Sequence, residues 1–224
     1  MTPSAEPATP DPVGALHTTH LTVPRTARVV TAGALPARAR RIWYALHGYG
    51  QLASRFANDL LPLAGADHLV VPEGLSRFYL RGEAGGIGAS WMTREDREVE
   101  IQDHVRYLDA VHAHLTPPPE TPVRVLGFSQ GAATACRWAA YGGLQPEQVV
   151  LWGGGVPPDL DWDRASDRMR GIRFTLVTGT SDPFMPRDAV DRSAGILRGH
   201  GITPDVVWFA GGHHFESGIL KELA

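Results

Sequence analysis

One short stretch of the chain combines a serine with the glycines that a strained turn requires. The pentapeptide Gly-Phe-Ser-Gln-Gly at 127–131 follows a run of β-branched and apolar residues, 122–126, and precedes small helix-forming residues that continue to Tyr141. This pattern is typical of a strand, a sharp turn and a helix with the serine at the tip. Because the chain holds 25 glycines, the spacing alone is a weak signal, and the flanking runs carry the interpretation. Ser129 is therefore a candidate nucleophile.

A serine hydroxyl needs a base to remove its proton, and the base needs an acid to orient it. Candidates for both follow later predicted strands. Asp182 lies in the segment 178–183 after an expected strand at 172–177, and His213 lies in the segment 210–214 after an expected strand at 205–209. The carboxyl ends of parallel strands share one sheet edge, so these loops should meet Ser129. We predict that Ser129, Asp182 and His213 form a triad.

The acid and the base each have competitors. Asp182 precedes Pro183, where an aspartate is also a common turn residue, and the aspartates at 159, 161 and 163 are rival acids. Their spacing resembles a calcium loop, but Arg164 stands where that loop needs glycine. His214 competes with His213, and the two preceding glycines favour His213. Since only Glu216 adds a ligand type near this histidine pair, we predict no metal.

A tetrahedral intermediate of acyl transfer needs two donors aimed at its oxyanion. The backbone N–H of Gln130, directly after the serine, is one candidate. The other is the N–H of Tyr49, in the segment His-Gly-Tyr-Gly at 47–50 that follows an expected strand. His47 itself is expected to be a structural hydrogen-bonding residue.

The elements that must position these groups alternate between strands and helices. We expect strands at 17–23, 27–32, 41–46, 68–71, 122–126, 148–152, 172–177 and 205–209, and helices at 52–63, 93–115, 132–141, 187–198 and 215–223. The segment 73–91 is expected to be a long loop. This alternation predicts an α/β protein with a mostly parallel central sheet and helices on both faces. We predict a disordered tail at 1–14 and one domain at 15–224.

Composition limits the cellular locations and the classes of binding partner to be expected. A net charge of −3 gives no electrostatic case for nucleic acid or for an anionic membrane surface. The start of the chain lacks the pattern of a signal peptide, and no apolar stretch is long enough to cross a bilayer. The single cysteine, Cys136, excludes an internal disulfide and fits a reducing compartment. We expect a cytoplasmic protein without stable membrane insertion, for which edge strands and exposed loops permit a homodimer.

The motifs together resemble the phospholipase/carboxylesterase branch of the α/β-hydrolases, which includes acyl-protein thioesterases. The matching pieces are Leu-His-Gly-Tyr-Gly at 46–50, Gly-Phe-Ser-Gln-Gly at 127–131, Ser-Asp-Pro at 181–183 and Gly-Gly-His at 211–213. The resemblance implies an α/β-hydrolase fold and cofactor-free cleavage of carboxylic or thio esters of small molecules. The chain departs from the family at Gln51, where an aspartate is usual, and in the segment 73–91.

The hypothesis is a serine esterase that works through an acyl-enzyme. The alternatives are an acyltransferase on the same fold and a non-catalytic binding module. The insertion between 152 and 172 is too short for a large lid domain, so we expect an open cleft that suits small or solvent-presented esters, with a small-molecule ester as the substrate. An apolar acyl pocket is expected from residues on loops at the active edge, although several of them are equally candidates for the core: Trp91, Trp152, Phe184, Met185, His214 and Phe215.

Overall fold

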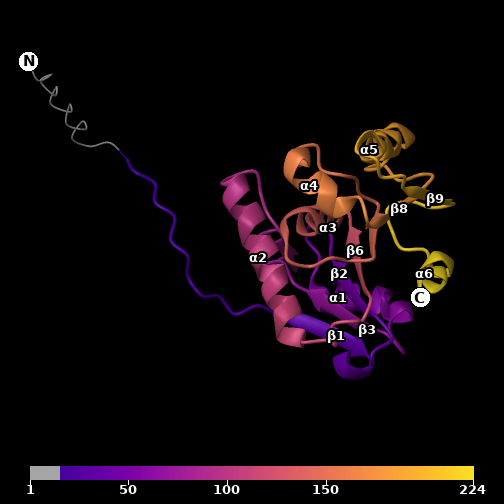
Figure 1. Cartoon of the computed structure of the whole chain (residues 1–224). Helices are drawn as coiled ribbons and strands as arrows, with labels where there is room; N and C mark the ends of the chain where they lie inside the picture. The colour runs from indigo at the N-terminus through magenta and orange to yellow at the C-terminus, as the bar shows by residue number, and fades with distance from the viewer. Residues whose placement is uncertain (1–15) are drawn as a thin grey trace, which may run out of the picture.

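A seven-stranded sheet forms the centre of the computed structural model, which describes residues 16–224 (Figure 1). The strand order is β1-β3-β2-β6-β7-β8-β9, and every neighbouring pair is parallel except β1 with β3. The strands are β1 (Val29–Gly33), β2 (Ile42–Leu46), β3 (His68–Pro72), β6 (Val123–Phe128), β7 (Gln148–Trp152), β8 (Arg173–Gly179) and β9 (Asp205–Phe209). The predicted α/β architecture is confirmed.

Helices cover both faces of the sheet, because its inner strands are apolar on both sides. In β2, Tyr44 faces one core and Trp43 faces the other, and both are fully buried. The first core is completed by α2 (Arg97–Leu115), α3 (Gln130–Tyr141), α4 (Trp162–Met169) and α5 (Arg187–Gly199). The second is completed by α1 (Ala53–Asp59) and α6 (Ser217–Leu223). None of the helices within residues 16–224 is long and apolar enough to cross a membrane.

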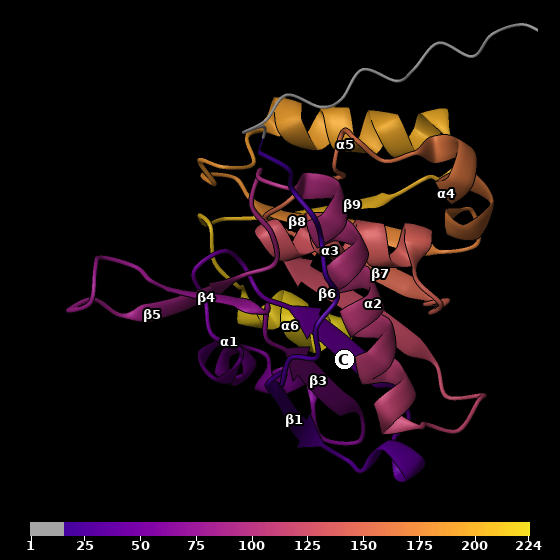
Figure 2. The ribbon, with the colours of Figure 1, turned by 90° about the vertical axis from the view of Figure 1, so that its left-hand side faces the viewer.

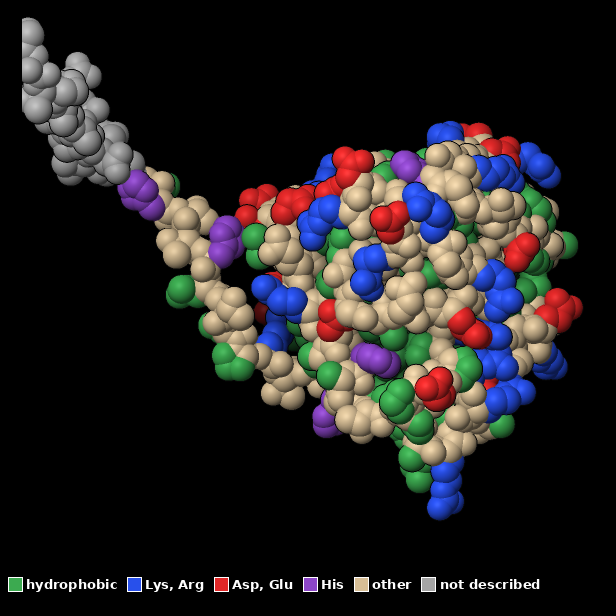
Figure 3. Space-filling view, viewed as in Figure 1, with side chains coloured by type: hydrophobic (Ala, Val, Ile, Leu, Met, Phe, Trp, Pro, Cys, Tyr) green, Lys and Arg blue, Asp and Glu red, His purple; other side chains and the backbone are tan. Residues whose placement is uncertain are grey.

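The N-terminal expectations require correction. The predicted strand at 17–23 is absent: residues 16–28 form an extended, exposed segment that joins the body at β1 (Figures 1 and 3). Its apolar side chains have no buried surface to pack against, since Leu21 and Val23 are 82% and 70% exposed. The predicted tail at 1–14 lies outside the described residues. On the face shown in Figure 3, acidic and basic side chains are interspersed.

Several helix boundaries also differ from the prediction. α1 ends at Asp59 and a short 3₁₀ turn follows, because Pro62 cannot donate to a continuing helix. α2 begins at Arg97, since Asp96 adopts a left-handed conformation with φ of 46°. Of the aspartates considered for calcium, Asp159 and Asp161 precede an unpredicted helix, α4, and Asp163 lies in its first turn. The Asp161 carboxylate caps this helix by accepting the Arg164 N–H.

The expected loop at 73–91 is an antiparallel hairpin of β4 (Ser76–Tyr79) and β5 (Ile87–Ser90). The hairpin projects from the body in Figure 2. Its base is attached to the segment after β2: the Gly50 N–H donates to the Ala89 carbonyl at 2.9 Å, and the Ala89 N–H donates to Gln51 at 3.2 Å. A Cβ at Gly88 would lie 2.6 Å from the Gly50 oxygen, so only glycine fits this crossing.

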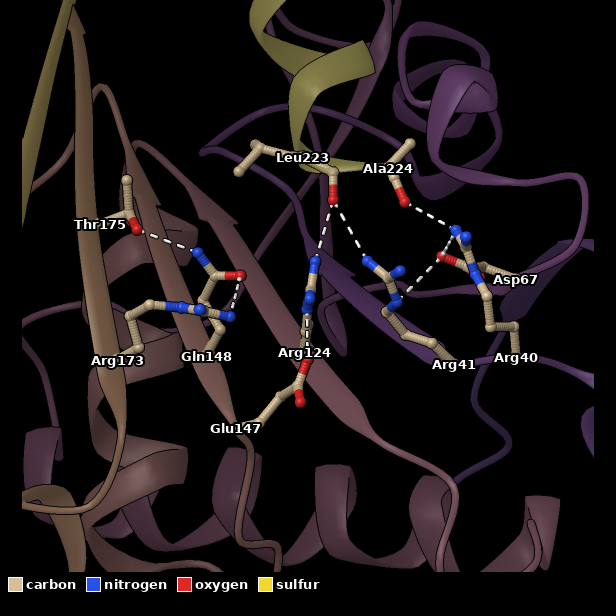
Figure 4. Close-up of polar contacts among 10 residues, drawn as sticks. All are labelled: Arg40, Arg41, Asp67, Arg124, Glu147, Gln148, Arg173, Thr175, Leu223 and Ala224. Atoms are coloured by element: carbon tan, nitrogen blue, oxygen red, sulfur yellow. Dashed lines mark hydrogen bonds and ion pairs between the residues drawn. The ribbon is translucent and has the colours of Figure 1, made fainter.

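A polar network fixes the C-terminal helix against the amino ends of the central strands (Figure 4). The Arg41 and Arg124 guanidinium groups both donate to the Leu223 carbonyl, at 3.3 and 3.0 Å. Arg124 also pairs with Glu147, and Asp67 is buried beneath Arg41 at 3.3 Å. Because α6 follows the loop that carries His213, this network anchors the far end of that loop.

Candidate active site

Ser129 occupies a strained turn between β6 and α3. Its φ of 54° and ψ of −115° lie outside the regions that L-residues normally adopt. A Cβ on Gly127 would lie 2.2 Å from the Gly131 oxygen, and one on Gly131 would lie 2.0 Å from the Leu46 oxygen. Both glycines are therefore required by backbone packing, which holds the serine in its strained conformation.

Asp182 and His213 form a direct pair. The Nδ1 of His213 lies 2.7 Å from Oδ2 of Asp182, whose side chain is only 1% exposed. The other oxygen, Oδ1, accepts the backbone N–H groups of Phe184 at 2.8 Å and Met185 at 3.2 Å. A carboxylate can only accept, so Nδ1 carries a proton and Nε2 is left as the basic nitrogen.

Two glycines after β7 bring the serine and the histidine into one neighbourhood. A Cβ on Gly153 would lie 3.0 Å from the His213 ring and 3.3 Å from Oδ2 of Asp182. A Cβ on the next residue, Gly154, would lie 2.5 Å from the carbonyl oxygen of Ser129. The structure therefore brings together the three residues of the predicted triad. Ser129 Oγ makes no hydrogen bond within residues 16–224, and in unliganded sites such contacts often form only with substrate.

The His213 ring lies between two aromatic side chains. Its centroid is 4.7 Å from that of Phe128 and 4.8 Å from that of Phe184. The indole N–H of Trp152 donates to the His214 carbonyl at 3.0 Å and so ties the histidine loop to the end of β7. His214 is exposed and turns back on its own loop, where Nδ1 lies 2.9 Å from the Phe215 carbonyl. The two adjacent histidines therefore have different partners: His213 bonds to Asp182, and His214 bonds to its own loop.

The segment after β2 lies beside the serine. A Cβ on Gly48 would lie 3.2 Å from Cβ of Ser129. The Gly48 N–H donates to the side-chain oxygen of Gln51 at 2.7 Å, so Gln51 closes this turn. The backbone N–H groups of Tyr49 and Gln130 have no acceptor among the described residues, which leaves both available to an incoming oxyanion.

His47 supports this segment from inside the protein. The ring is fully buried, its Nδ1–H donates to the Gly48 carbonyl at 2.8 Å, and its Nε2 accepts the Gly74 N–H at 2.9 Å. Burial lowers the pKa of His47, so the ring remains neutral and keeps both hydrogen bonds. The structure thus gives His47 the structural role expected for it.

The side chain of Gln130 ties the serine turn to the base of the hairpin. Its Oε1 accepts the Trp91 N–H at 3.1 Å, and its Nε2 donates to the Met92 carbonyl at 2.9 Å and to Ser90 Oγ at 3.1 Å. The Trp91 indole N–H in turn donates to the His47 carbonyl at 2.8 Å. Sequence reasoning assigned Gln130 a backbone role alone, since no local pattern indicates where a glutamine side chain bonds.

A cavity of about 850 Å³ opens beside Tyr49 and Gln130. Of the residues predicted for an acyl pocket, Met185 lines this cavity. Trp91 and Trp152 are instead buried in the core, at 4% and 1% exposure. Phe184 is 71% exposed beside His213. His214 and Phe215 lie on the histidine loop, away from the cavity walls.

The acids and histidines are otherwise dispersed. Across the part of the chain that the structure describes, no three His, Cys, Asp or Glu side chains are grouped as metal ligands would be. Cys136 is buried, and burial raises the pKa of its thiol to about 12, so it stays protonated. Ser129 is the nucleophile candidate of this site.

Comparison with known proteins identifies the fold. No protein-family model matches the chain, and no curated protein sequence matches it. The structure of Zea mays acyl-protein thioesterase 2 matches with a TM-score of 0.69 and 20% identity over 88% of this chain and 98% of that chain. A Mesorhizobium loti carboxylesterase matches with a TM-score of 0.68 and 18% identity, over 88% and 92%. A phospholipase/carboxylesterase from Dyadobacter fermentans matches with 0.65 and 19%, over 90% and 96%.

These matches cover most of this chain, whose mostly parallel sheet is covered by helices on both faces. They confirm, at the level of the fold, the predicted resemblance to phospholipase/carboxylesterase and thioesterase structures. The chain has the α/β-hydrolase fold.

Proposed function

We propose that the protein is a serine hydrolase that cleaves carboxylic esters, including thioesters, through an acyl-enzyme on Ser129. The observation that carries this proposal is the buried Asp182–His213 pair at 2.7 Å, next to a serine held in a strained turn. Structures of esterases and a thioesterase with the same fold support it. Fold alone does not assign a reaction, so the proposal depends on the site.

The reaction begins with attack on the ester carbonyl. Nε2 of His213 takes the Ser129 Oγ proton as Oγ bonds to the carbonyl carbon, and the carbonyl oxygen becomes an oxyanion. The N–H groups of Tyr49 and Gln130 donate to that oxyanion, while the Asp182 carboxylate stabilises the imidazolium. Nε2–H then protonates the leaving oxygen or sulfur as its bond to carbon breaks. Water then attacks the acyl-enzyme in the same way, with Nε2 of His213 as its base. The bond from the acyl carbon to Ser129 Oγ breaks, Oγ regains its proton and the carboxylic acid leaves.

The test is covalent labelling with a fluorophosphonate probe, together with turnover of short p-nitrophenyl esters. We expect the wild type to label and turn over, and Ser129→Ala to do neither. Ser54→Ala, on an exposed turn of α1, is the matched control and should behave as the wild type. Full turnover by a folded Ser129→Ala variant would refute the proposal.

A second comparison tests the assignment of the base. His213→Ala should lose labelling and turnover, because the serine then has no base, whereas His214→Ala should retain both. Adding an alcohol and analysing the products separates hydrolysis from acyl transfer: the free acid should dominate. If the acyl group passes mainly to the alcohol, the protein is an acyltransferase instead.

A further inference from the structure

Arginine side chains surround the cavity beside the candidate oxyanion donors. Its lining includes Arg94, Arg97, Arg137 and Arg192, and no acidic residue. The rest of the wall is largely apolar, with Met92, Ala133, Val156, Met185 and Ile196 among its members. An apolar wall with a cationic rim fits a ligand that has an aliphatic body and an anionic end.

Neighbouring carboxylates neutralise only part of this positive charge. Asp159 forms ion pairs with two of the arginines, Arg97 at 2.5 Å and Arg137 at 3.0 Å. Asp188 pairs with Arg192, which is 67% exposed. Arg94 forms no ion pair with any residue from 16 to 224. Two carboxylates thus pair with three of the four lining arginines, of which Arg137 is buried, and Arg94 keeps its guanidinium without an ion pair within residues 16–224.

None of the acids close to Arg94 in sequence forms an ion pair with it among residues 16–224. Glu95 forms no ion pair within residues 16–224, and Glu100 accepts the N–H of Thr93 on the cavity wall. Asp96 faces His20 at 3.3 Å, and Glu98 lines a separate cavity together with Asp159. Arg94 is an exposed residue of the segment between β5 and α2, so its guanidinium is accessible to a ligand in the cavity.

The proposed chemistry decides which part of an ester enters this cavity. The leaving group must face Nε2 of His213, which protonates it, and His213 is not on the cavity wall. Tyr49 and Gln130, whose N–H groups would hold the carbonyl oxygen, are on that wall. The acyl chain therefore extends from the carbonyl into the cavity, toward the arginines.

We propose that the cavity selects acyl groups that end in an anion, so that the preferred substrates are monoesters or monothioesters of aliphatic dicarboxylic acids. This inference rests on the proposed hydrolase function. The far carboxylate meets Arg94 and Arg192 at the rim, where a planar guanidinium offers two parallel hydrogen bonds to a carboxylate. The methylene chain lies against the apolar wall between the two ends.

The test compares two substrates that differ only in charge at the far end. One is the p-nitrophenyl monoester of suberic acid, and the other is the same compound with its free carboxyl group methylated. We expect kcat/KM of the wild type to be roughly tenfold higher for the carboxylate ester, after each rate is divided by its uncatalysed rate. The preference should fall as salt rises, because the rim is exposed.

Variants test whether the arginines at the cavity rim cause the preference for the carboxylate ester. Arg94→Gln and Arg192→Gln should each reduce the carboxylate preference several-fold, and the double variant should bring it close to one. Arg198→Gln, an exposed arginine on the same helix as Arg192 but outside the cavity, is the matched control and should keep the preference. Equal cleavage of both esters by the wild type overturns this inference and leaves the hydrolase proposal standing. Cleavage of neither ester also overturns this inference, and turnover of the short p-nitrophenyl esters then decides the hydrolase proposal separately.

Discussion

Replacing Asp182 by asparagine tests the proposed mechanism most sharply, because the structure determines how the new side chain must lie. Oδ1 of Asp182 accepts two backbone N–H groups, from Phe184 and Met185. In Asp182→Asn the amide oxygen takes that place, since an NH₂ group there would oppose two buried donors. Reversing the amide would cost roughly 1–3 kcal/mol for each donor left without an acceptor.

The amide NH₂ group is then directed at Nδ1 of His213. Nδ1 must accept this hydrogen bond, so the ring proton moves to Nε2 and the base that Ser129 needs is lost. A Ser-His-Asp site held in the wrong tautomer loses about 10⁴-fold in kcat, equivalent to roughly 5 kcal/mol of activation free energy. The fold should survive, because aspartate and asparagine have nearly the same shape.

The assay is steady-state release of p-nitrophenol from a short ester, with thermal unfolding measured alongside. Asp167→Asn is the matched control: this aspartate is 91% exposed, pairs with Arg170 on the surface, and should keep kcat within about twofold of the wild type. A folded Asp182→Asn variant that keeps more than a tenth of wild-type kcat would refute the tautomer argument.

Three further predictions concern the surroundings of the site. Gln130→Leu removes the bonds to the hairpin base and should lower kcat roughly tenfold with little change in KM, measured on the same ester. Gly131→Ala should destabilise the fold strongly in urea unfolding, because its Cβ would meet Leu46, whereas Gly195→Ala, with open space around it, should gain up to about 1 kcal/mol. Burial, with a smaller contribution from a nearby arginine, lowers the pKa of His104 to about 4. The unfolded state therefore binds the extra proton first, the free energy of unfolding should fall as pH drops from 6.5 toward 4, and His104→Gln should weaken that slope.

The central strands could be predicted from sequence because their chemistry is local. The stretch 149–152 is apolar on both sides, as a strand buried between two helical layers must be, and it lies in β7. The turn at Ser129 could also be predicted, since its glycine spacing and the strand and helix patterns that flank it are local in the sequence. Asp182 and His213 could be predicted from their positions after the expected strands. The 2.7 Å contact between them could be found only in the structure.

The hairpin at 73–91 could not be predicted, because its strands depend on partners distant in sequence. β4 and β5 have only four residues each, which is too short for a clear alternating pattern. What fixes β5 is its pairing with the segment after β2, at Gly50 and Gln51, and the bonds from the Gln130 side chain. These contacts are set by tertiary packing, which periodicity does not encode.

The site therefore has two parts that differ in how they are held. The reacting groups are fixed by backbone: Ser129 persists at a φ that costs about 1–3 kcal/mol because its N–H donates to Trp152 and glycines on either side pack against neighbouring chain. The arginine rim depends instead on long side chains at exposed positions such as Arg94 and Arg192. A change at the rim alters no backbone contact, so acyl selectivity can change while the reacting groups keep their geometry. A change at Gly127 or Gly131 must disturb the fold before it can affect selectivity.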